Sequence, residues 1–545
     1  MIELSCDVLV VGGGAAGSRA VLEAKRCYPE LKVLLAVAGK CGKTGSTQLI
    51  ASESLGINAP FNFAGDGDSA DVYYQDMLAT GGGLSDPRLC RIIADEACAR
   101  IRDLTDLGLV FDCNAGIPIQ TKLSGCTKAR SLTCGGSTGR EMLKALQKGN
   151  AELGVDVLEN VRILELCQND NGRVIGAIGL RGVDVVVIRA GATVLAMGGA
   201  GRLFRKNVNP PTLEGDGWAM AYRAGACMVN MEFFQIGPGV VEPKIQFIIH
   251  SHMWKLNPKL TNAKGEQFLG NYCPEGVTPA EVIDAKTMSY PFSVRTVAKY
   301  LDIAIFKELV SGRGSANDGV YFDVTHIGEE ELRRRAPITC ETLRKAGADL
   351  AKDKIELGPM VQNFNGGVLI DENGFTGVEG LYAAGEVTGG VHGSDRPGGN
   401  NLIDTQVFGC RAGRAASDFA QSMEGKRSRA SLARGISSSL QTRTSLDTEI
   451  ASKRAVLYER ELTVVRTATG LKKVLEFVDE QTPRSDSCAE RNGLLVGQII
   501  ALAALAREES RGTHYREDFP ETDAGQNRRI ILRAGTNGEP IVQLG

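Results

Sequence analysis

Apolar and polar positions near the N-terminus follow two different periods. Residues 7–11, DVLVV, and residues 32–37, KVLLAV, are apolar runs of strand length. Between them, SRAVLEAKR at 18–26 has the spacing of a helix with one apolar face. The pattern predicts a β-α-β unit, the usual opening of an α/β domain.

Strand-like runs return much later in the chain. DVVVIRAGATVLAMGGAGR at 184–202 is typical of a hairpin followed by a strand that runs into two glycines, and 366–387 is typical of two strands around a turn. The block 235–350 differs in texture, because it mixes polar loops with helical stretches such as 296–309. A charged region with a helical pattern follows at 446–511.

These changes of pattern predict an α/β fold in which one domain is interrupted by another. We expect the first domain at 1–234 and 355–425, with an α+β capping domain inserted at 235–354. A C-terminal helical domain and tail would occupy 426–545, and the Ser/Arg-rich segment 428–445 is the expected linker.

The first turn carries the clearest chemical signal. GGGAAG at 12–17 contains G-x-G-x-x-G at Gly12, Gly14 and Gly17, between a predicted strand and a predicted helix. In this setting the first glycine makes the tight turn, the second admits a pyrophosphate, and the third lets the helix pack on the strand. We therefore predict a Rossmann-like dinucleotide site, although the second strand ends in Ala-Val-Ala and lacks the carboxylate expected for the ribose.

Composition narrows the remaining function classes. A chain of 545 residues is too long for one core, and a formal net charge of −3 gives no reason to expect nucleic acid or an anionic membrane as a partner. No apolar run reaches the length needed to cross a bilayer, and the first strand begins too early to leave room for a signal peptide. We expect a cytoplasmic protein.

The 14 cysteines show no Cys-x-x-Cys spacing. We interpret them as reduced, mostly buried thiols, which argues against an iron–sulfur or zinc site built from this chain.

The stretch VHGSDRPGGNNLID at 391–404 places Arg396 between glycine pairs and before a helical pattern. Glycines allow a close backbone approach, and a guanidinium binds a planar anion bidentately. An arginine that merely caps a turn is the alternative interpretation.

Motifs along nearly the whole chain occur in the order found in one known family. The chain resembles the flavoprotein subunits of succinate dehydrogenase and fumarate reductase, together with L-aspartate oxidase. The resemblance is carried by DVLVVGGGAAG, GKTGSTQLIASESLGINA, TGREMLKAL, TVLAMGGAGRLF, EGDGWAMAYRAGA, MEFFQ, NAKGEQF, SVRTVAKYLDIAI, FNGGVLIDENGFTGVEGLYAAGEV, VHGSDRPGGNNLIDTQVFGCRAG and ESRGTHYREDFP.

The resemblance implies an FAD-binding first domain and a set of residues around the cofactor. It implies that the cofactor is held by Gly12, Gly14, Ala15, Ala16, Gly17, Gly42, Ser46, Thr47, Val161, Ala196, Gly198, Asp216, Gly385, Glu386, Asn401 and Leu402. Respiratory members attach the flavin through a histidine where this chain has Ser46, so we expect non-covalent FAD.

The same resemblance implies roles for two arginines. Arg396 would pair with a substrate carboxylate, and Arg295, expected on a helix of the capping domain, would deliver or remove a proton opposite flavin N5. A solvated helix arginine is the alternative for Arg295. Arg130 falls where L-aspartate oxidase has an arginine.

The chain departs from the family pattern at the substrate. Gly237 and Gln362 stand where the family has histidines, and His250 and Ser251 stand where it has a Thr-Glu pair. Two lost imidazole donors, each contributing about 1.5–3 kcal/mol, would leave a dicarboxylate poorly held at one end. His250 is therefore a candidate catalytic residue, and His252 a candidate new donor.

We expect hydride transfer between flavin N5 and a small organic anion other than the usual dicarboxylates. The alternatives are a sulfur-oxyanion flavoprotein resembling the adenylylsulfate reductase alpha subunit, or an electron carrier within a larger complex. The electron partner stays open between oxygen, a quinone, fumarate, and a separate iron–sulfur or other electron-transfer subunit.

Overall fold

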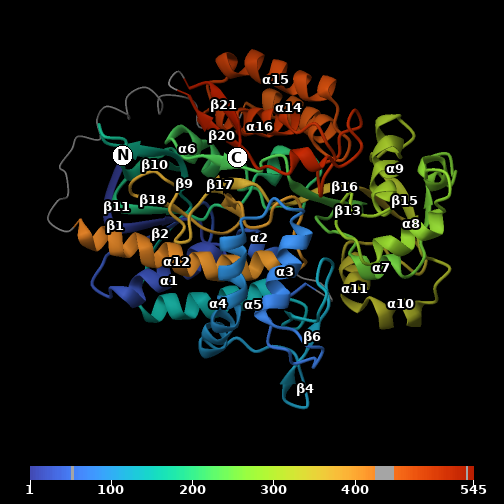
Figure 1. The fold of residues 1–545 in the computed structure, drawn as a ribbon, viewed down its shortest axis with the longest axis horizontal. Helices are drawn as coiled ribbons and strands as arrows, with labels where there is room; N and C mark the ends of the chain where they lie inside the picture. The colour runs from blue at the N-terminus through green and yellow to red at the C-terminus, as the bar shows by residue number, and fades with distance from the viewer. Residues whose placement is uncertain (51–54, 424–446, 536–537) are drawn as a thin grey trace.

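The computed structural model describes residues 1–50, 55–423, 447–535 and 538–545. The expected linker at 428–445 lies outside these residues. The fold is mixed helix and sheet, as expected from the sequence, and its main sheet is flanked by helices from both early and late segments of the chain (Figure 1).

The main sheet has seven strands in the order β8-β2-β1-β11-β10-β9, with β18 also paired to β11. The predicted opening unit is present, because β1 and β2 run parallel and α1 connects them. From Cys6 to Val11 every residue of β1 is buried, as expected for a strand covered on both faces. The strands are β1 Ile2–Val11, β2 Val33–Val37, β8 Asp156–Glu159, β9 Arg162–Gln168, β10 Val174–Arg181, β11 Asp184–Leu195 and β18 Leu381–Ala383.

The prediction of a hairpin within 184–202 was wrong. Residues 184–195 form one continuous strand, β11, and its hairpin partner is the preceding strand β10. Gly191, within this strand, is a point of close approach, because a Cβ there would lie 2.8 Å from the backbone oxygen of Asp7.

Helices from three parts of the chain cover one side of this sheet. The long helix α12 packs along α1, while α4 and α5 lie beside them (Figure 1). These helices are α1 Ala15–Cys27, α3 Ala70–Thr80, α4 Pro87–Asp106, α5 Thr138–Glu152 and α12 Asn400–Ser422, with the short α2 at Ser46–Leu49. Small antiparallel pairings beside them involve β3 Ile57–Asn58, β4 Cys113–Asn114, β5 Ile117–Pro118, β6 Gln120–Thr121 and β7 Ser131–Leu132.

A second hydrophobic core lies in the region predicted as the capping domain. Its buried residues run from Val240 to Leu357 around a four-stranded sheet in the order β13-β16-β15-β14. The strands are β13 Phe234–Glu242, β14 Lys259–Thr261, β15 Val320–Asp323 and β16 Ile355–Phe364; the helices are α7 Ser251–Trp254, α8 Pro279–Lys286, α9 Lys299–Val310, α10 Glu329–Arg335 and α11 Pro337–Lys345. The domain boundaries themselves stay predictions.

The C-terminal region begins with three packed helices, α14 Thr448–Leu462, α15 Ala468–Gln481 and α16 Cys488–Ala506. The tail is not helical. Two strands, β20 Ile530–Ala534 and β21 Pro540–Leu544, extend a five-stranded sheet in the order β19-β17-β12-β20-β21. The other three strands are β12 Met228–Val229, β17 Gly367–Leu369 and β19 Thr388–Gly389. The end of the chain therefore returns to segments of the first domain.

Helix α16 corrects one expectation from composition. Among the described residues it is the one helix long and apolar enough to cross a membrane by length and composition. About two thirds of it, 67%, is buried inside the fold, where it packs on α14, α15 and α6 (Asp216–Arg223). Packing within a protein core accounts for such a composition.

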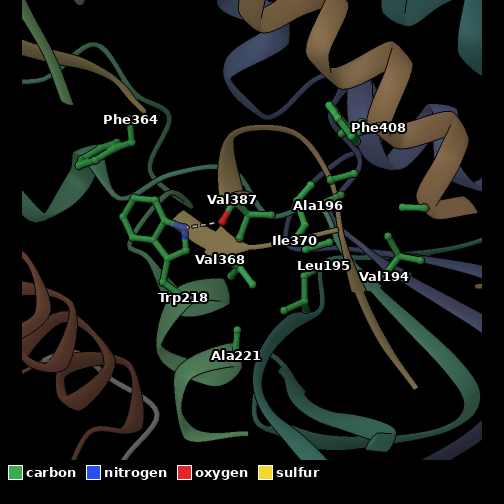
Figure 2. Close-up of a cluster of buried hydrophobic side chains, with 14 of the residues drawn as sticks. Val194, Leu195, Ala196, Trp218, Ala221, Phe364, Val368, Ile370, Val387 and Phe408 are labelled. Atoms are coloured by element: carbon green, nitrogen blue, oxygen red, sulfur yellow. Dashed lines mark hydrogen bonds between the residues drawn. The ribbon is translucent and has the colours of Figure 1, made fainter. Parts of the chain in front are cut away.

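A buried cluster joins the main sheet to the site described below (Figure 2). Trp218 on α6 donates a hydrogen bond from Nε1 to the backbone oxygen of Val387, 2.8 Å away, and its ring meets Phe364 edge-on. Leu195 at the end of β11 lies in the same cluster. The cluster fixes the start of α6 and the short 3-10 turn at 385–387 relative to the sheet.

Candidate functional site

A cleft opens where the parallel strands β1 and β2 end, which is the usual place for a nucleotide in such sheets. All of the predicted cofactor residues line it except Gly17, Gly42 and Gly385. The arrangement therefore gathers predicted residues from seven separated stretches of the chain around one cleft, as the resemblance implies.

A side chain at each glycine of the first turn would meet a different neighbour. Gly12 has a φ of +110°, and a Cβ there would lie 2.2 Å from the backbone oxygen of Ala196. A Cβ at Gly17 would lie 1.8 Å from the backbone oxygen of Gly12. A Cβ at Gly14 would meet only Thr47 Oγ1, at 3.5 Å, because this position faces the cleft. The turn thus forms a cradle at the N-terminus of α1, which suits a pyrophosphate.

The other two glycines outside the cleft shape its walls. Gly42 and Gly385 have φ values of +70° and +75°, in the left-handed region that favours glycine. A Cβ at Gly42 would overlap the side chain of Gln147, and one at Gly385 would lie 2.8 Å from Ala16 Cβ. Their contribution is backbone conformation and close packing.

Arg162 was missed by the sequence reasoning although it lines the cleft. Its Nε donates to Asp216 Oδ2 at 2.8 Å, and its Nη2 pairs with Glu214 Oε2 at 2.5 Å. Burial alone would lower the pKa of Arg162, but the two carboxylates outweigh burial and raise it. Asp216 also accepts a hydrogen bond from Asn492 of α16. No local motif marks Arg162, because its partners lie more than 50 residues away.

Glu386 lies at the junction of two cavities. Its Oε1 accepts a hydrogen bond of 3.1 Å from the backbone N–H of Phe364. Burial raises the pKa of this carboxyl to about 7, and the nearby charge of Arg396 only partly opposes the shift. Glu386 is thus able to hold a proton near neutral pH and to donate or accept a hydrogen bond within the cleft.

The second cavity adjoins the first. The two share Ser46, Ile50, Asn363, Glu386 and Asn401. The resemblance puts Ser46 and Asn401 at the flavin, so this cavity is the candidate substrate side.

His250 reaches this second cavity, as the sequence reasoning expected of a new cavity residue. It stands at the N-terminal end of α7, and burial lowers its pKa to about 3, so the imidazole is neutral at pH 7. His252 does not line the cavity; its Nε2 lies 3.4 Å from Thr339 Oγ1.

Arg396 is buried on the approach to α12. Its Nη2 donates to Gln235 Oε1 at 2.6 Å, and its Nη1 makes a long contact of 3.4 Å with the backbone oxygen of Pro397. The Nε is buried and has no hydrogen-bond partner among the described residues. Burial lowers the pKa of Arg396 to about 10, which still leaves it protonated at neutral pH. A buried cation with an unused donor is suited to receive an anion.

Arg295 does not lie on a helix, which corrects the expectation from the sequence. It occupies the turn that precedes α9. Its Nε and Nη2 both contact Asp395 Oδ2, at 3.1 and 2.8 Å, and its side chain stays 35% exposed. From this turn the guanidinium reaches Asp395 in the loop before α12.

Asp395 connects the two arginines and was also missed. One carboxylate oxygen pairs with Arg295, while the other accepts hydrogen bonds from the backbone N–H of Arg396 and, at 3.3 Å, from Gln235 Nε2. The Asp-Arg adjacency at 395–396 was the available signal in the sequence. Neither arginine is among the residues that line the two cavities.

Arg130 is not part of this site. Its guanidinium is fully buried and pairs with Asp68 and Asp76, each at 2.8 Å, and it stacks 4.6 Å over the ring of Tyr73. Two carboxylates neutralise the charge, so Arg130 holds the loop at 120–132 against α3 and has no charge left for a substrate.

The described residues contain no group of three or more His, Cys, Asp or Glu side chains that could hold a metal ion. All fourteen cysteines lie within the described part of the chain, and all are free thiols.

Comparison with known proteins, like the cleft, indicates an FAD-binding protein. The FAD binding domain family matches residues 7–402, and the fumarate reductase flavoprotein C-terminal family matches residues 482–540. A fumarate reductase (CoM/CoB) subunit of Methanothermobacter marburgensis is 34% identical over 97% of each chain. L-aspartate oxidase of Caulobacter vibrioides is 30% identical over 97% of this chain and 96% of its own. The structure of Mycobacterium smegmatis Sdh1 with UQ1 superposes with a TM-score of 0.87 at 28% identity, covering 100% of this chain and 94% of that one.

Proposed function

This chain belongs to the FAD-binding flavoprotein family that includes fumarate reductase subunits and L-aspartate oxidases, and from this premise we propose the reaction of its site. It is an FAD-dependent oxidoreductase. We propose that it transfers a hydride between bound FAD and a carbon of a small organic anion other than the usual dicarboxylates. The observation that carries the proposal is the buried Arg396, whose Nε is unpaired within the described residues.

The cleft fits FAD by its own geometry. We propose that the backbone at Gly14 and Ala15, at the N-terminus of α1, receives the pyrophosphate, and that Glu386 and Asn401 lie at the flavin end. The bound cofactor supplies a hydride donor or acceptor at its N5 position. No carboxylate side chain that could bind the ribose stands at the end of β2, because Ala38 and Gly39 line the cleft there.

We propose that the FAD is held without a covalent bond. The position that carries the attaching histidine in respiratory members is Ser46, whose Oγ is buried and has no partner within the described part of the chain. A serine hydroxyl is a weaker nucleophile than an imidazole and offers a hydrogen bond instead. Acid precipitation of the purified protein should release all of the flavin into the supernatant.

We propose that Arg396 binds and orients the anion. Gln235 accepts a hydrogen bond from Nη2, and this contact orients the guanidinium while the Nε stays unpaired among the described residues. An anion bound by such a preorganised fork replaces water without a large entropic cost.

We propose that Arg295 exchanges the proton that accompanies hydride transfer. The support is its coupling to Asp395, which orients its guanidinium and links it to the backbone of Arg396. Asp395 favours the charged guanidinium, so it orients Arg295 and favours return of a proton to Arg295 after one has been given up.

A separate electron-transfer subunit is the partner we propose. The support is that one relative of 34% identity is named as one of the subunits of its enzyme. Electrons taken up at the cleft would leave through that separate protein.

The test is anaerobic stopped-flow absorbance of the flavin against small carboxylates, amino acids and sulfur oxyanions. Arg295→Ala should abolish turnover, by more than about a thousandfold, while FAD stays bound. Arg396→Ala should weaken anion binding about ten- to a hundredfold, because it removes charge-assisted hydrogen bonds. Arg344→Ala, at an exposed arginine on α11, is the matched control.

Full activity of Arg295→Ala would overturn the assigned role of that residue. Flavin reduction by sulfite alone, with no response to organic anions, would favour the sulfur-oxyanion alternative. A flavin that only a partner protein can reduce would make the chain an electron carrier.

A further inference from the structure

Tyr290 is a residue that the mechanism above does not use. Its hydroxyl is buried and has no hydrogen-bond partner among the described residues. A Cβ built on Gly237 would lie 2.5 Å from this hydroxyl, so the phenol fills the space that a side chain at 237 would need. Gly237 stands at one of the two positions where the resemblance implies a histidine. Buried polar groups in native proteins are nearly always satisfied, so an unpaired hydroxyl at this position is available to hydrogen-bond a bound molecule.

The loop that carries Tyr290 is held at three points. The backbone N–H of Tyr290 donates to Ser124 Oγ at 3.3 Å, that of Phe292 to the backbone oxygen of Ile236 at 2.8 Å, and that of Val294 to the backbone oxygen of Gly512 at 2.8 Å. The same loop ends in Arg295. Tyr290 and Arg295 are therefore fixed together against β13, and the hydroxyl is not placed by chance packing of a free side chain.

The hydroxyl lies on the same face of β13 as the anion-binding arginine. Side chains at 235 and 237 point to one face of the strand, because the period of a strand is two residues. Gln235 on this face binds Arg396, and the Tyr290 hydroxyl occupies the side-chain space of Gly237. Positions 235 and 237 of the strand are roughly 7 Å apart, so the two groups contact neighbouring positions on one face.

The second position where the resemblance implies a histidine also has an uncharged polar group without a partner among the described residues. Gln362 lies at a β-bulge, because the pairing of β13 with β16 shifts between Gln235–Asn363 and Ile236–Val361 and leaves Gln362 without a partner residue. Its side chain lines the second cavity, and its Oε1 is buried with no partner in the described residues. Bulges often re-aim a side chain beside an active site. Within the part of the chain that the structure describes, two uncharged polar groups thus stand unpaired at the two histidine positions.

The charges around Tyr290 cancel. Lys286 lies 5.5 Å from the centre of the Tyr290 ring, but its Nζ is paired with the buried Asp302. His250, whose ring centre is 5.6 Å from that of Tyr290, is neutral because burial lowers its pKa to about 3. Burial also raises the pKa of Tyr290 well above its usual value of 10, so the phenol stays protonated. This end of the site offers hydrogen bonds without a positive charge.

We infer that the Tyr290 hydroxyl, with Gln362, is a substrate-binding group, and that the site selects an anion with one carboxylate and an uncharged polar group at its far end. The carboxylate binds Arg396, and an amide, ketone or hydroxyl at the other end bonds to Tyr290 and Gln362. This inference rests on the proposed function, because it requires an organic anion at Arg396. A second carboxylate would be desolvated against neutral groups and would be disfavoured.

Three probes of one shape test this inference. The probes are fumarate, its monoamide fumaramate, and crotonate. All three have a trans four-carbon skeleton with a carboxylate at one end. At the other end fumarate has a second carboxylate, fumaramate an amide and crotonate a methyl group. Binding to the oxidised FAD-loaded protein is measured from the flavin difference spectrum, which does not require turnover. We expect fumaramate to bind at least about tenfold more tightly than either of the others.

Tyr290→Phe removes the hydroxyl and keeps the ring that fills the space at Gly237. It should weaken fumaramate about tenfold and leave crotonate unchanged, whereas a merely structural tyrosine would affect all three probes equally. Tyr321→Phe, on β15 of the same sheet, is the matched control. A second variant, Gln362→Leu, should show the same selective loss.

Fumarate binding more tightly than fumaramate would overturn the inference, and so would an unchanged fumaramate affinity in Tyr290→Phe and Gln362→Leu. A different result would contradict the proposed function: Arg396→Ala would leave the affinity for all three probes unchanged, or none of the probes would bind.

Discussion

Glu386 illustrates how single residues acquire their chemistry from burial. Its carboxyl lies between the two cavities, and its pKa rises to about 7 because burial disfavours the charged form. Asp216, another acid in the same cleft, instead has Arg162 and Asn492 as partners. Two acids of the same cleft therefore differ in their partners: Asp216 is paired with an arginine, and Glu386 is not.

The pH dependence of the flavin-free protein should report Glu386. Its pKa in the folded state, about 7, is above the ordinary value of 4.5, so between these values the folded state holds a proton that the unfolded state has lost. The free energy of unfolding should therefore decrease as pH rises from about 5 to 7 and level off above that. We expect a change of about 1–2 kcal/mol, since the carboxyl lines an open cavity and is partly hydrated.

Urea denaturation of the flavin-free protein at pH 5, 6 and 7 measures this change. Glu386→Gln should flatten the dependence, and Glu379→Gln, at an exposed acid near the start of β18, should not. Equal slopes in the wild type and in Glu386→Gln would assign the pH effect to other groups.

At the scale of elements, the strand–turn–helix from β1 to α1 forms one wall of the cleft proposed to bind FAD. Gly12 and Gly17 are needed for the turn itself, because their hydrogens face the backbone of Ala196 and of Gly12 at distances too short for a Cβ. Gly14 is different, since it has ordinary backbone angles of φ −71° and ψ −171° and faces the cleft. One motif therefore contains positions required for folding and a position required for binding.

Alanine substitutions should separate these two requirements. Gly14→Ala should lower FAD affinity at least about tenfold and leave the stability of the flavin-free protein within about 0.5 kcal/mol, because the new methyl group occupies cofactor space only. Gly17→Ala should destabilise the flavin-free protein by about 2 kcal/mol or more through overpacking against Gly12.

Flavin content and urea denaturation measure the two effects, and Gly328→Ala, in open space before α10, is the control. A Gly14→Ala protein that retains full FAD affinity would show that this position does not face the cofactor.

At the scale of the whole molecule, a buried charge cluster joins the C-terminal region to the first residues of β13. Arg507, just after α16, binds Glu232 at 2.7 Å and Glu509 at 2.9 Å. Arg466 donates to the backbone oxygen of Glu232 and contacts the neutral His514. Glu232 lies three residues before Gln235, so the C-terminal region braces the strand that presents Gln235 to Arg396.

Removing one partner of this cluster should be costly. Arg507→Met should lower the free energy of unfolding by about 3–5 kcal/mol, because it leaves Glu232 buried without its main counter-charge. The double variant Arg507→Met with Glu232→Gln should recover a large part of the loss. The exposed Arg484–Glu480 pair is the control, and Arg484→Ala should cost less than about 1 kcal/mol.

Guanidinium denaturation checks these values. A loss in Arg507→Met no larger than that in Arg484→Ala would show that the cluster does not hold the two regions together.

Local patterns were sufficient for most of the architecture. The β-α-β opening, the helix within 296–309 and the strands at 366–387 were predicted, and the α/β fold with FAD as cofactor is confirmed. The hairpin at 184–202 and the helical position of Arg295 were wrong, because a glycine can mark close packing as well as a turn, and because a helical pattern does not fix the residue at which the helix begins.

The sequence by itself determined the glycine turn and the family, because these depend on sterics within a few residues and on motifs in fixed order. It also predicted a set of residues most of which the structure brings to one cleft. Tertiary structure alone decided which charges are available. Arg130 and Arg396 are both buried arginines with one unpaired donor among the described residues. Two carboxylates pair with the first guanidinium, whereas the second hydrogen-bonds to the neutral Gln235 and a backbone oxygen. It also placed the hydroxyl of Tyr290 in the space left by Gly237, 53 positions earlier in the chain. Burial and partners come from distant segments, and they set charge state and hydrogen-bonding capacity in ways that no local pattern encodes.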